Sequence, residues 1–294
     1  MSKTINFKRE RDLGAIITDT FGFIRNQWKP YFTVILKILW PFIAVSVFIL
    51  VMYLYSFGNL FSSLTNVSTR GSSPFTFEGS GSIIWGLLLM LTALITYTLL
   101  HLASMYYIKS YIENPDEIDF KAIVQQTRIK FWSLLGFLFL SYFLMIIGIF
   151  LCFFPGIYLM IVFALGTPIM IFENKGVGDT LSYCFTLIKD KWFETFGVLF
   201  VVGFLVGILG YVFNIPALIY TIFKAISTIG KNDPTAFAGI ITDPIYVILN
   251  VISYAGRFLL SAVTIISTAF VYFDLNEQKF QSGTIETIES LGNN

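Results

Sequence analysis

Four polar residues lie in or beside long apolar runs, where ionisable side chains are costly and often functional. They are Arg257, His101, Glu173 and Lys37. Arg257 lies about 18 Å along the run that begins at Ile245, at a rise of ~1.5 Å per residue. Either it is buried near the middle of a bilayer and needs an anionic partner, or the helix is tilted or shifted and the side chain reaches toward the membrane surface.

The other polar residues predict anchors and packing contacts more than chemistry. His101 is the only histidine, and no cluster of Cys, Asp or Glu surrounds it as a metal site requires. A packed or hydrogen-bonded histidine is therefore favoured over a ligand or proton carrier. Lys37 lies about two turns into its run and is expected to anchor at the headgroups.

Other sequence features argue against catalysis and ion-coupled transport. All eighteen acidic residues fall at the ends of apolar runs, in loops or in tails, so none lies where a coupled transporter would hold one. The sequence has no phosphate loop, metalloprotease motif or nucleophile elbow. We expect a protein that is not an enzyme and that holds no cofactor or metal.

The composition predicts an all-α integral membrane protein. Hydrophobic residues make up 56% of the 294 residues and charged residues only 13%, which is outside the range of soluble domains. Most of the apolar runs are near the ~20 residues that a helix needs to cross a bilayer. They predict six spans, at 32–57, 83–108, 132–153, 156–172, 196–214 and 245–273.

The distribution of cations predicts the orientation, because Lys and Arg near the ends of spans are retained in the cytoplasm. Most precede the first span or follow the second and fourth, and the opposite side has only Arg70, Lys224 and Lys231. Both termini should face the cytoplasm. A net charge of +1 gives no case for nucleic-acid binding, whereas the N-terminal cations can contact anionic membrane lipid.

Amphipathic helices are predicted before alternate spans. Residues 11–29, 116–131 and 177–193 each place apolar side chains on one side of a helix, and we call these segments elbows. Trp28 and Trp192 lie within the first and third elbows, Trp132 directly follows the second, and all three are predicted to anchor the elbows. The first and third share a pattern in which Gly14, Phe21, Ile24, Arg25, Trp28 and Phe32 match Gly178, Phe185, Ile188, Lys189, Trp192 and Phe196.

Each elbow is followed by two spans, so one membrane domain, 1–294, divides into three elbow-and-hairpin units at 11–108, 116–173 and 177–273. Either the units are true internal repeats, or the shared aromatic and tryptophan positions recur because each elbow meets the surface of a bilayer. Four connections are predicted from composition: a flexible outer loop at 58–82, a tight turn at 154–156, an outer-surface helix at 216–229 and a cytoplasmic tail at 275–294.

One segment resembles a known family. Phe154-Pro155-Gly156-Ile157-Tyr158-Leu159 is followed by Thr167-Pro168, by Phe172-Glu173-Asn174-Lys175-Gly176, and then by Leu181-Ser182 and Trp192. This order is similar to that of bacterial membrane proteins related to the membrane domain of glycerophosphoryl diester phosphodiesterases and to YciC-like inner-membrane proteins. The resemblance implies six spans, cytoplasmic termini and a bacterial inner membrane. It implies no catalysis, and it gives Glu173 a role in docking the third elbow against the fourth span, as a cap or as the partner of a nearby lysine.

These features favour a non-enzymatic scaffold or subunit of a bacterial envelope complex, bound to membrane lipid and to other envelope proteins. The alternative is a transporter or lipid-handling protein with a path between the hairpins and with Arg257 facing an anionic group.

Overall fold

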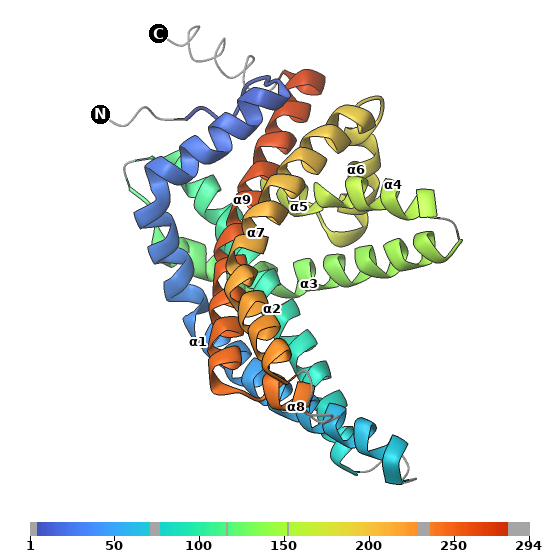
Figure 1. Cartoon of the computed structure of the whole chain (residues 1–294). Helices are drawn as coiled ribbons and strands as arrows, with labels where there is room; N and C mark the ends of the chain where they lie inside the picture. Colours follow the sequence, from blue (N-terminus) through green and yellow to red (C-terminus); the bar gives the residue numbers. More distant parts are fainter. Residues whose placement is uncertain (1–4, 71–76, 116, 152, 229–235, 282–294) are drawn as a thin grey trace, which may run out of the picture. The chain divides into compact units, whose positions relative to one another are not determined.

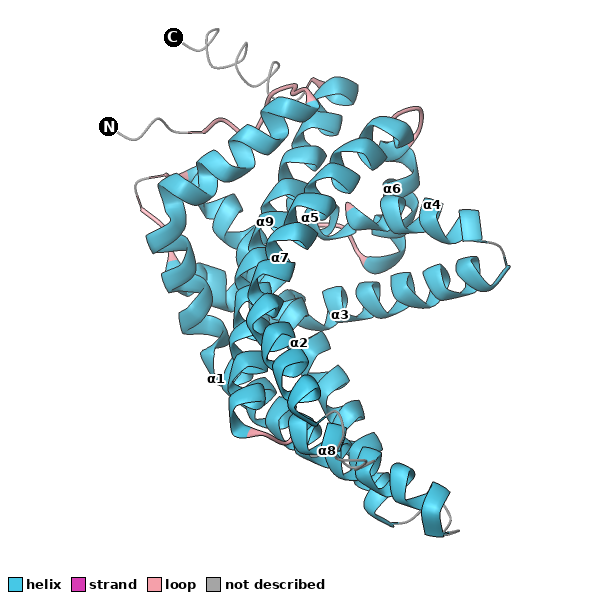
Figure 2. Cartoon of the chain, in the orientation of Figure 1, coloured by secondary structure: helices cyan, strands magenta, loops and turns pink. Residues whose placement is uncertain are grey.

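The computed structural model describes residues 5–70, 77–115, 117–151, 153–228 and 236–281. Helices joined by short loops form almost all of these residues, and no strand occurs among them (Figure 1; Figure 2). The helices of this described part are α1 (Leu13–Arg70), α2 (Phe77–Glu113), α3 (Phe120–Leu151), α4 (Phe153–Ala164), α5 (Gly166–Phe172), α6 (Val177–Ile188), α7 (Trp192–Thr228), α8 (Ala236–Ile241) and α9 (Pro244–Phe280). The predicted all-α class is confirmed.

Six helical segments of the described chain are long and apolar enough to cross a membrane. They are Leu13–Ser62, Gly81–Glu113, Phe120–Leu151, Phe153–Phe172, Trp192–Ser227 and Pro244–Phe280. The fourth combines α4 and α5, and Pro168 lies inside α5. Six spans were predicted from the apolar runs, and these six helices fit a multi-pass membrane protein.

The chain divides into two compact units that are not continuous in sequence. The first unit holds residues 1–38, 98–206 and 261–294, and the second holds residues 39–97 and 207–260. Helices α3 to α6 belong wholly to the first unit, whereas α1, α2, α7 and α9 contribute residues to both.

Aromatic side chains dominate the core of the first unit. Every residue of α9 from 265 to 275 is buried, as is typical of a helix surrounded by other elements. Phe7, which precedes α1, stacks on Phe270 of α9 with 4.4 Å between ring centroids. The edges of Phe23 and Tyr111 meet the same Phe7 ring. This cluster fastens the N-terminal segment to α9.

Helices α3 and α4 form a hairpin whose turn lies slightly before the predicted one. Phe154-Pro155-Gly156 falls in the first turn of α4, and only residue 152, which lies outside the described residues, separates the two helices. Proline is tolerated there because the first turn of a helix has no intrahelical partner for its backbone N–H groups. Gly148 and Gly156 allow the helices to touch, since a Cβ at Gly148 would lie 3.1 Å from the Gly156 backbone.

In the second unit, tertiary packing extends helices through segments predicted as loops. The prediction of a loop at 58–82 is wrong for its described ends, because α1 continues to Arg70 and α2 begins at Phe77. Gly58 lies against Thr242 and the carbonyl of Ala238, so its lack of a side chain serves close packing instead of a turn. Residues 71–76 lie outside the described part.

The predicted outer helix at 216–229 is likewise not a separate element. Pro216 lies inside the continuous helix α7, of which Thr228 is the last residue. Interior proline frees a backbone carbonyl, and neighbouring polar groups can compensate in a membrane helix. Pro216 frees the Val212 carbonyl, and the neighbouring Phe213 carbonyl accepts a 2.6 Å hydrogen bond from the Ser253 hydroxyl of α9.

Two of the three elbows continue directly into their spans. Residues 13–29 belong to α1 and residues 120–131 to α3, although Figure 1 shows α1 changing direction after its dark-blue start. Pro30 lies inside α1, where proline favours a bend. The third elbow is a helix of its own, α6, which ends before Asp190 with a φ of 68°.

The predicted tail also begins as helix, since α9 reaches Phe280, while residues 282–294 lie outside the described part.

Candidate functional site

A buried arginine organises the segment that leads into α1. The Arg11 side chain is fully enclosed, and its Nε donates a 2.9 Å hydrogen bond to Asp19. Its two terminal nitrogens donate to the backbone carbonyls of Asn6, Phe7 and Arg9. Burial lowers the pKa of Arg11 and the hydrogen bond to Asp19 opposes this effect, so the guanidinium stays protonated.

The same residue fastens α1 to α9. The backbone N–H of Arg11 donates a 2.7 Å hydrogen bond to Oδ1 of Asp274, and Nε2 of Gln278 donates to Oδ2 at 3.1 Å. The Arg11 guanidinium lies over the Phe270 ring, 4.8 Å from its centroid. Asp274 is therefore a buried carboxylate whose two oxygens are both occupied, which is the usual condition for burying such a group.

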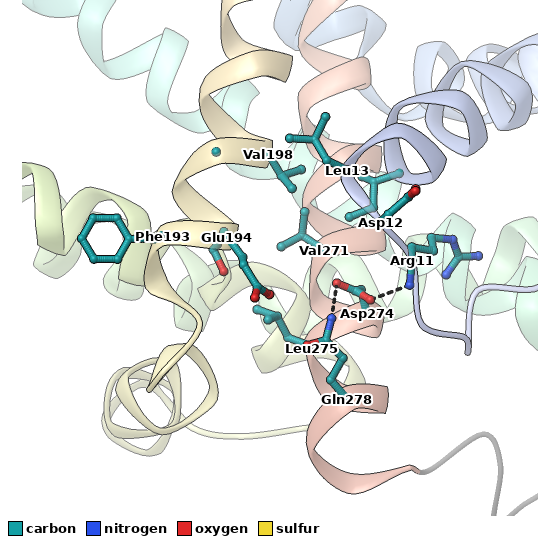
Figure 3. A pocket seen from close by; sticks show the side chains of 13 residues that line it. Arg11, Asp12, Leu13, Phe193, Glu194, Val198, Val271, Asp274, Leu275 and Gln278 are labelled. Atoms are coloured by element: carbon teal, nitrogen blue, oxygen red, sulfur yellow. Dashed lines mark hydrogen bonds between the residues drawn. The ribbon is translucent and has the colours of Figure 1, made fainter.

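A pocket of about 330 Å³ opens beside this network, between the starts of α1 and α7 and the end of α9 (Figure 3). Figure 3 shows Asp12 from the α1 side, Glu194 from the α7 side and Asp274 from α9 around it. The complete lining is Arg11, Asp12, Leu13, Ile16, Phe193, Glu194, Thr195, Gly197, Val198, Val271, Asp274, Leu275 and Gln278. We call this the acidic pocket, because its lining contains three carboxylates and one guanidinium above apolar side chains.

The carboxylates of the acidic pocket are suited to recognition. Asp12 accepts a 2.7 Å hydrogen bond from the backbone N–H of Ala15 and so caps α1. Glu194 pairs with Lys191 at 3.0 Å, with both side chains well exposed, so the pair is weak and Glu194 can exchange partners. Within the described residues, no group of three or more His, Cys, Asp or Glu side chains could hold a metal ion. The pocket can attract a cation, and its apolar lining can hold the carbon chain that carries it.

The structure places Arg257 on the exposed side of α9, in the second unit. It makes no ion pair or hydrogen bond to a described residue, and it does not line the acidic pocket. Arg257 thus has no anionic partner among the described residues, and its depth in the membrane stays a prediction. Its neighbours Ile252 and Leu259 are also exposed, as befits the outer side of a membrane helix.

Glu173 docks α5 against α9, but not through the predicted lysine. The Tyr272 hydroxyl donates a 2.6 Å hydrogen bond to the Glu173 carboxylate, and Phe172 stacks on the Tyr272 ring. Lys175 instead lies over the ring of Tyr183, at 4.5 Å from its centroid. A buried tyrosine hydroxyl needs an acceptor, and the carboxylate at the end of α5 supplies it.

The remaining candidates lie at separate places. His101 is buried in α2. Lys37 is exposed on α1, with its amine 5.7 Å from the centroid of the Phe120 ring. Trp28 and Trp132 are exposed, at 54% and 75%, whereas Trp192 stacks between Tyr158 and Phe196. The structure does not bring these residues together into one site.

Sequence reasoning missed the acidic pocket because its walls come from three distant segments. Arg11 was grouped with the N-terminal cations that predict the orientation, and Asp274 with the acidic residues at the ends of apolar runs, in loops or in tails. The one available signal was that Asp274, Asn276 and Glu277 directly follow an apolar run. The structure shows that all three are buried. A polar cluster in that position requires partners from elsewhere in the chain.

Comparisons with models of protein families, with curated proteins and with solved structures found no match.

Proposed function

We propose that this chain is a non-enzymatic membrane protein that serves as a scaffold or subunit of a bacterial envelope complex, and that the acidic pocket docks a partner. The acidic pocket carries this proposal. Its carboxylates, from the residue before α1 and from α7 and α9, surround apolar residues, and the buried Arg11 network fixes two of the three walls. Such a pocket suits a lysine or arginine side chain of a partner, with apolar residues beside it.

Electrostatics favours docking over acid–base chemistry in the acidic pocket. A general base must be free to take a proton from a substrate. Asp12 is occupied as a helix cap, and Asp274 accepts hydrogen bonds from two donors. Glu194 is the one lining carboxylate whose described partner, Lys191, a ligand cation can readily replace.

Two further parts of the proposal, the orientation in the membrane and the bacterial inner membrane as its location, rest on the sequence. The excess of Lys and Arg before the first span and after the second and fourth supports cytoplasmic termini. The acidic pocket would then open on the cytoplasmic side, since Asp12 precedes the first span. The resemblance to YciC-like inner-membrane proteins supports a bacterial inner membrane, and six described helices are long and apolar enough to cross a membrane.

The test is site-specific photo-crosslinking in native membranes. A photoreactive amino acid at Phe193, which is 83% exposed at the pocket rim, should capture one protein partner at endogenous expression. The double change Asp12→Asn and Glu194→Gln should reduce that product at least fivefold, because asparagine still caps α1 while both charges are lost. Glu117→Gln, which removes an exposed charge elsewhere, is the matched control.

Two outcomes would contradict the docking proposal. An unchanged crosslink in the double variant would show that the carboxylates do not bind the partner. Capture of one lipid class and no protein would favour the alternative, a transporter or lipid-handling protein.

A further inference from the structure

A second groove lies along the first turns of α3 and has the opposite charge. It measures about 450 Å³ and is lined by Phe120, Lys121, Val124, Gln125, Arg128 and Ile129. Lys121, Val124, Gln125 and Arg128 have the i, i+3, i+4, i+7 spacing of one helix face. No carboxylate lines it. We call it the basic groove.

The cations of the basic groove are available for a ligand. Lys121 and Arg128 are exposed, and neither forms an ion pair with any described residue. The neighbouring carboxylate of Asp119 accepts a 3.0 Å hydrogen bond from the backbone N–H of Ala122. A third cation adjoins the groove, since the Lys37 amine lies over the ring of Phe120.

Exposed apolar side chains lie beside these cations. Ile129 is 60% exposed, and Trp132 follows it at the start of the apolar part of α3. Tryptophan is enriched at the membrane–water boundary, and cations next to that boundary attract the phosphates of anionic lipids. The positive charge and the lipid-facing surface therefore meet within about three helical turns.

We propose that the basic groove binds the headgroup phosphate of an anionic glycerophospholipid. The Arg128 guanidinium can present two N–H donors to the phosphate oxygens, and Lys121 adds a point charge. Ile129 and Trp132 contact the start of the acyl chains. This inference is independent of the docking proposal, because the two sites share no residue.

Native mass spectrometry of the full-length protein in mild detergent tests the site. The probes are dioleoylphosphatidylglycerol, its zwitterionic counterpart dioleoylphosphatidylcholine, and soluble glycerol 3-phosphate. Lys121→Gln and Arg128→Gln should each weaken binding of phosphatidylglycerol roughly fivefold, since a cation near the membrane surface contributes ~1 kcal/mol. Lys130→Gln removes the same charge from the same helix outside the groove and should change the binding of phosphatidylglycerol less than twofold.

Each result supports or contradicts the binding of an anionic lipid in the basic groove. Selective loss in the two groove variants, with phosphatidylcholine binding unchanged, supports it. Equal loss in Lys130→Gln would show general attraction without a site, and unchanged binding in all variants would also overturn the proposal. Glycerol 3-phosphate competing as strongly as the lipid would assign the groove to a free phosphate. Gln125→Glu adds a negative charge to the groove and keeps both cations. It should weaken the binding of phosphatidylglycerol as much as Lys121→Gln or Arg128→Gln does.

Discussion

Arg11 is a charged side chain whose whole surface is enclosed by the protein. It is stable there because each of its nitrogens has an acceptor, either Asp19 or one of three carbonyls of the preceding turn. Taking a charge out of water is costly, and such an arrangement offsets the cost only while it is complete. Arg11 thus holds the segment before α1 in one conformation.

Arg11→Gln should lower the free energy of unfolding by about 3 kcal/mol, because three carbonyls and Asp19 lose a charged donor. Denaturant titration in mild detergent measures the change. Arg25, which is exposed on α1, is the control, and Arg25→Gln should change stability by less than ~0.5 kcal/mol. Equal effects of the two substitutions would contradict a structural role for Arg11.

Burial raises the pKa of the Cys184 thiol to about 12. In a Cys152→Ser background, N-ethylmaleimide should therefore modify the folded protein slowly up to pH 9 and the unfolded protein fast, because only the thiolate reacts. The unfolded thiol releases its proton first, so this group's contribution to stability should fall as pH rises from about 9 towards 12. Fast modification of the folded protein at pH 8 would show that Cys184 is accessible.

At the scale of elements, glycines decide how closely the helices of each unit approach. Gly166, at the start of α5, lies against the Phe137 ring of α3, and a Cβ there would overlap that ring. Gly256 of α9 has the same relation to Phe213 of α7 in the second unit. A helix interior normally disfavours glycine, so these positions exchange intrinsic helix stability for close packing.

Gly166→Ala should destabilise the protein by about 1–3 kcal/mol, because Phe137 is buried and cannot move freely. Gly136→Ala is the matched control, since no atom lies within 4 Å of the position that its new methyl group would take on α3. It should be neutral or stabilising by up to ~1 kcal/mol. Thermal unfolding of both variants in the same detergent compares them, and a stable Gly166→Ala protein would contradict the close contact.

The elements themselves were largely predictable, because runs of about twenty apolar residues have few alternatives to a helix. The residues at which the helices begin and end were less predictable. Glycine at 58 and proline at 216 are ordinary signals for a break, yet α1 and α7 continue through them, with Thr242 packed against Gly58 and Ser253 bonded to the Phe213 carbonyl. Local composition cannot show such contacts. Trp132 and Lys37 stay predicted anchors, because local pattern alone suggests them, whereas the pairing of Arg11 with distant Asp274 could not be predicted from local pattern.

At the scale of the whole molecule, the distribution of cations predicts which parts of the chain face each side of the membrane. The cations flank the same ends of successive predicted hairpins, and the connection at 71–76 should lie on the opposite side. The acidic pocket and the basic groove would both then be cytoplasmic, with opposite charges for a protein partner and a lipid.

Topology reporters test this assignment. An export-dependent phosphatase inserted at 71–76 should be active, and the same reporter between α2 and α3, at 115–117, should be inactive. A fluorescent protein that matures only in the cytoplasm should fluoresce at either terminus. The reverse pattern would place the acidic pocket outside the cytoplasm and remove the basis of the docking proposal.

The hydrogen bond from Arg11 to Asp274 joins residues 263 positions apart. During synthesis at ~5–20 residues per second, the N-terminal segment therefore waits roughly 15–50 s before its partner helix exists. Phe7 and the Arg11 guanidinium have no α9 to pack against throughout that interval. The aromatic core of the first unit is thus complete only after α9 has been synthesised, and a nascent chain that stops before α9 leaves this core open.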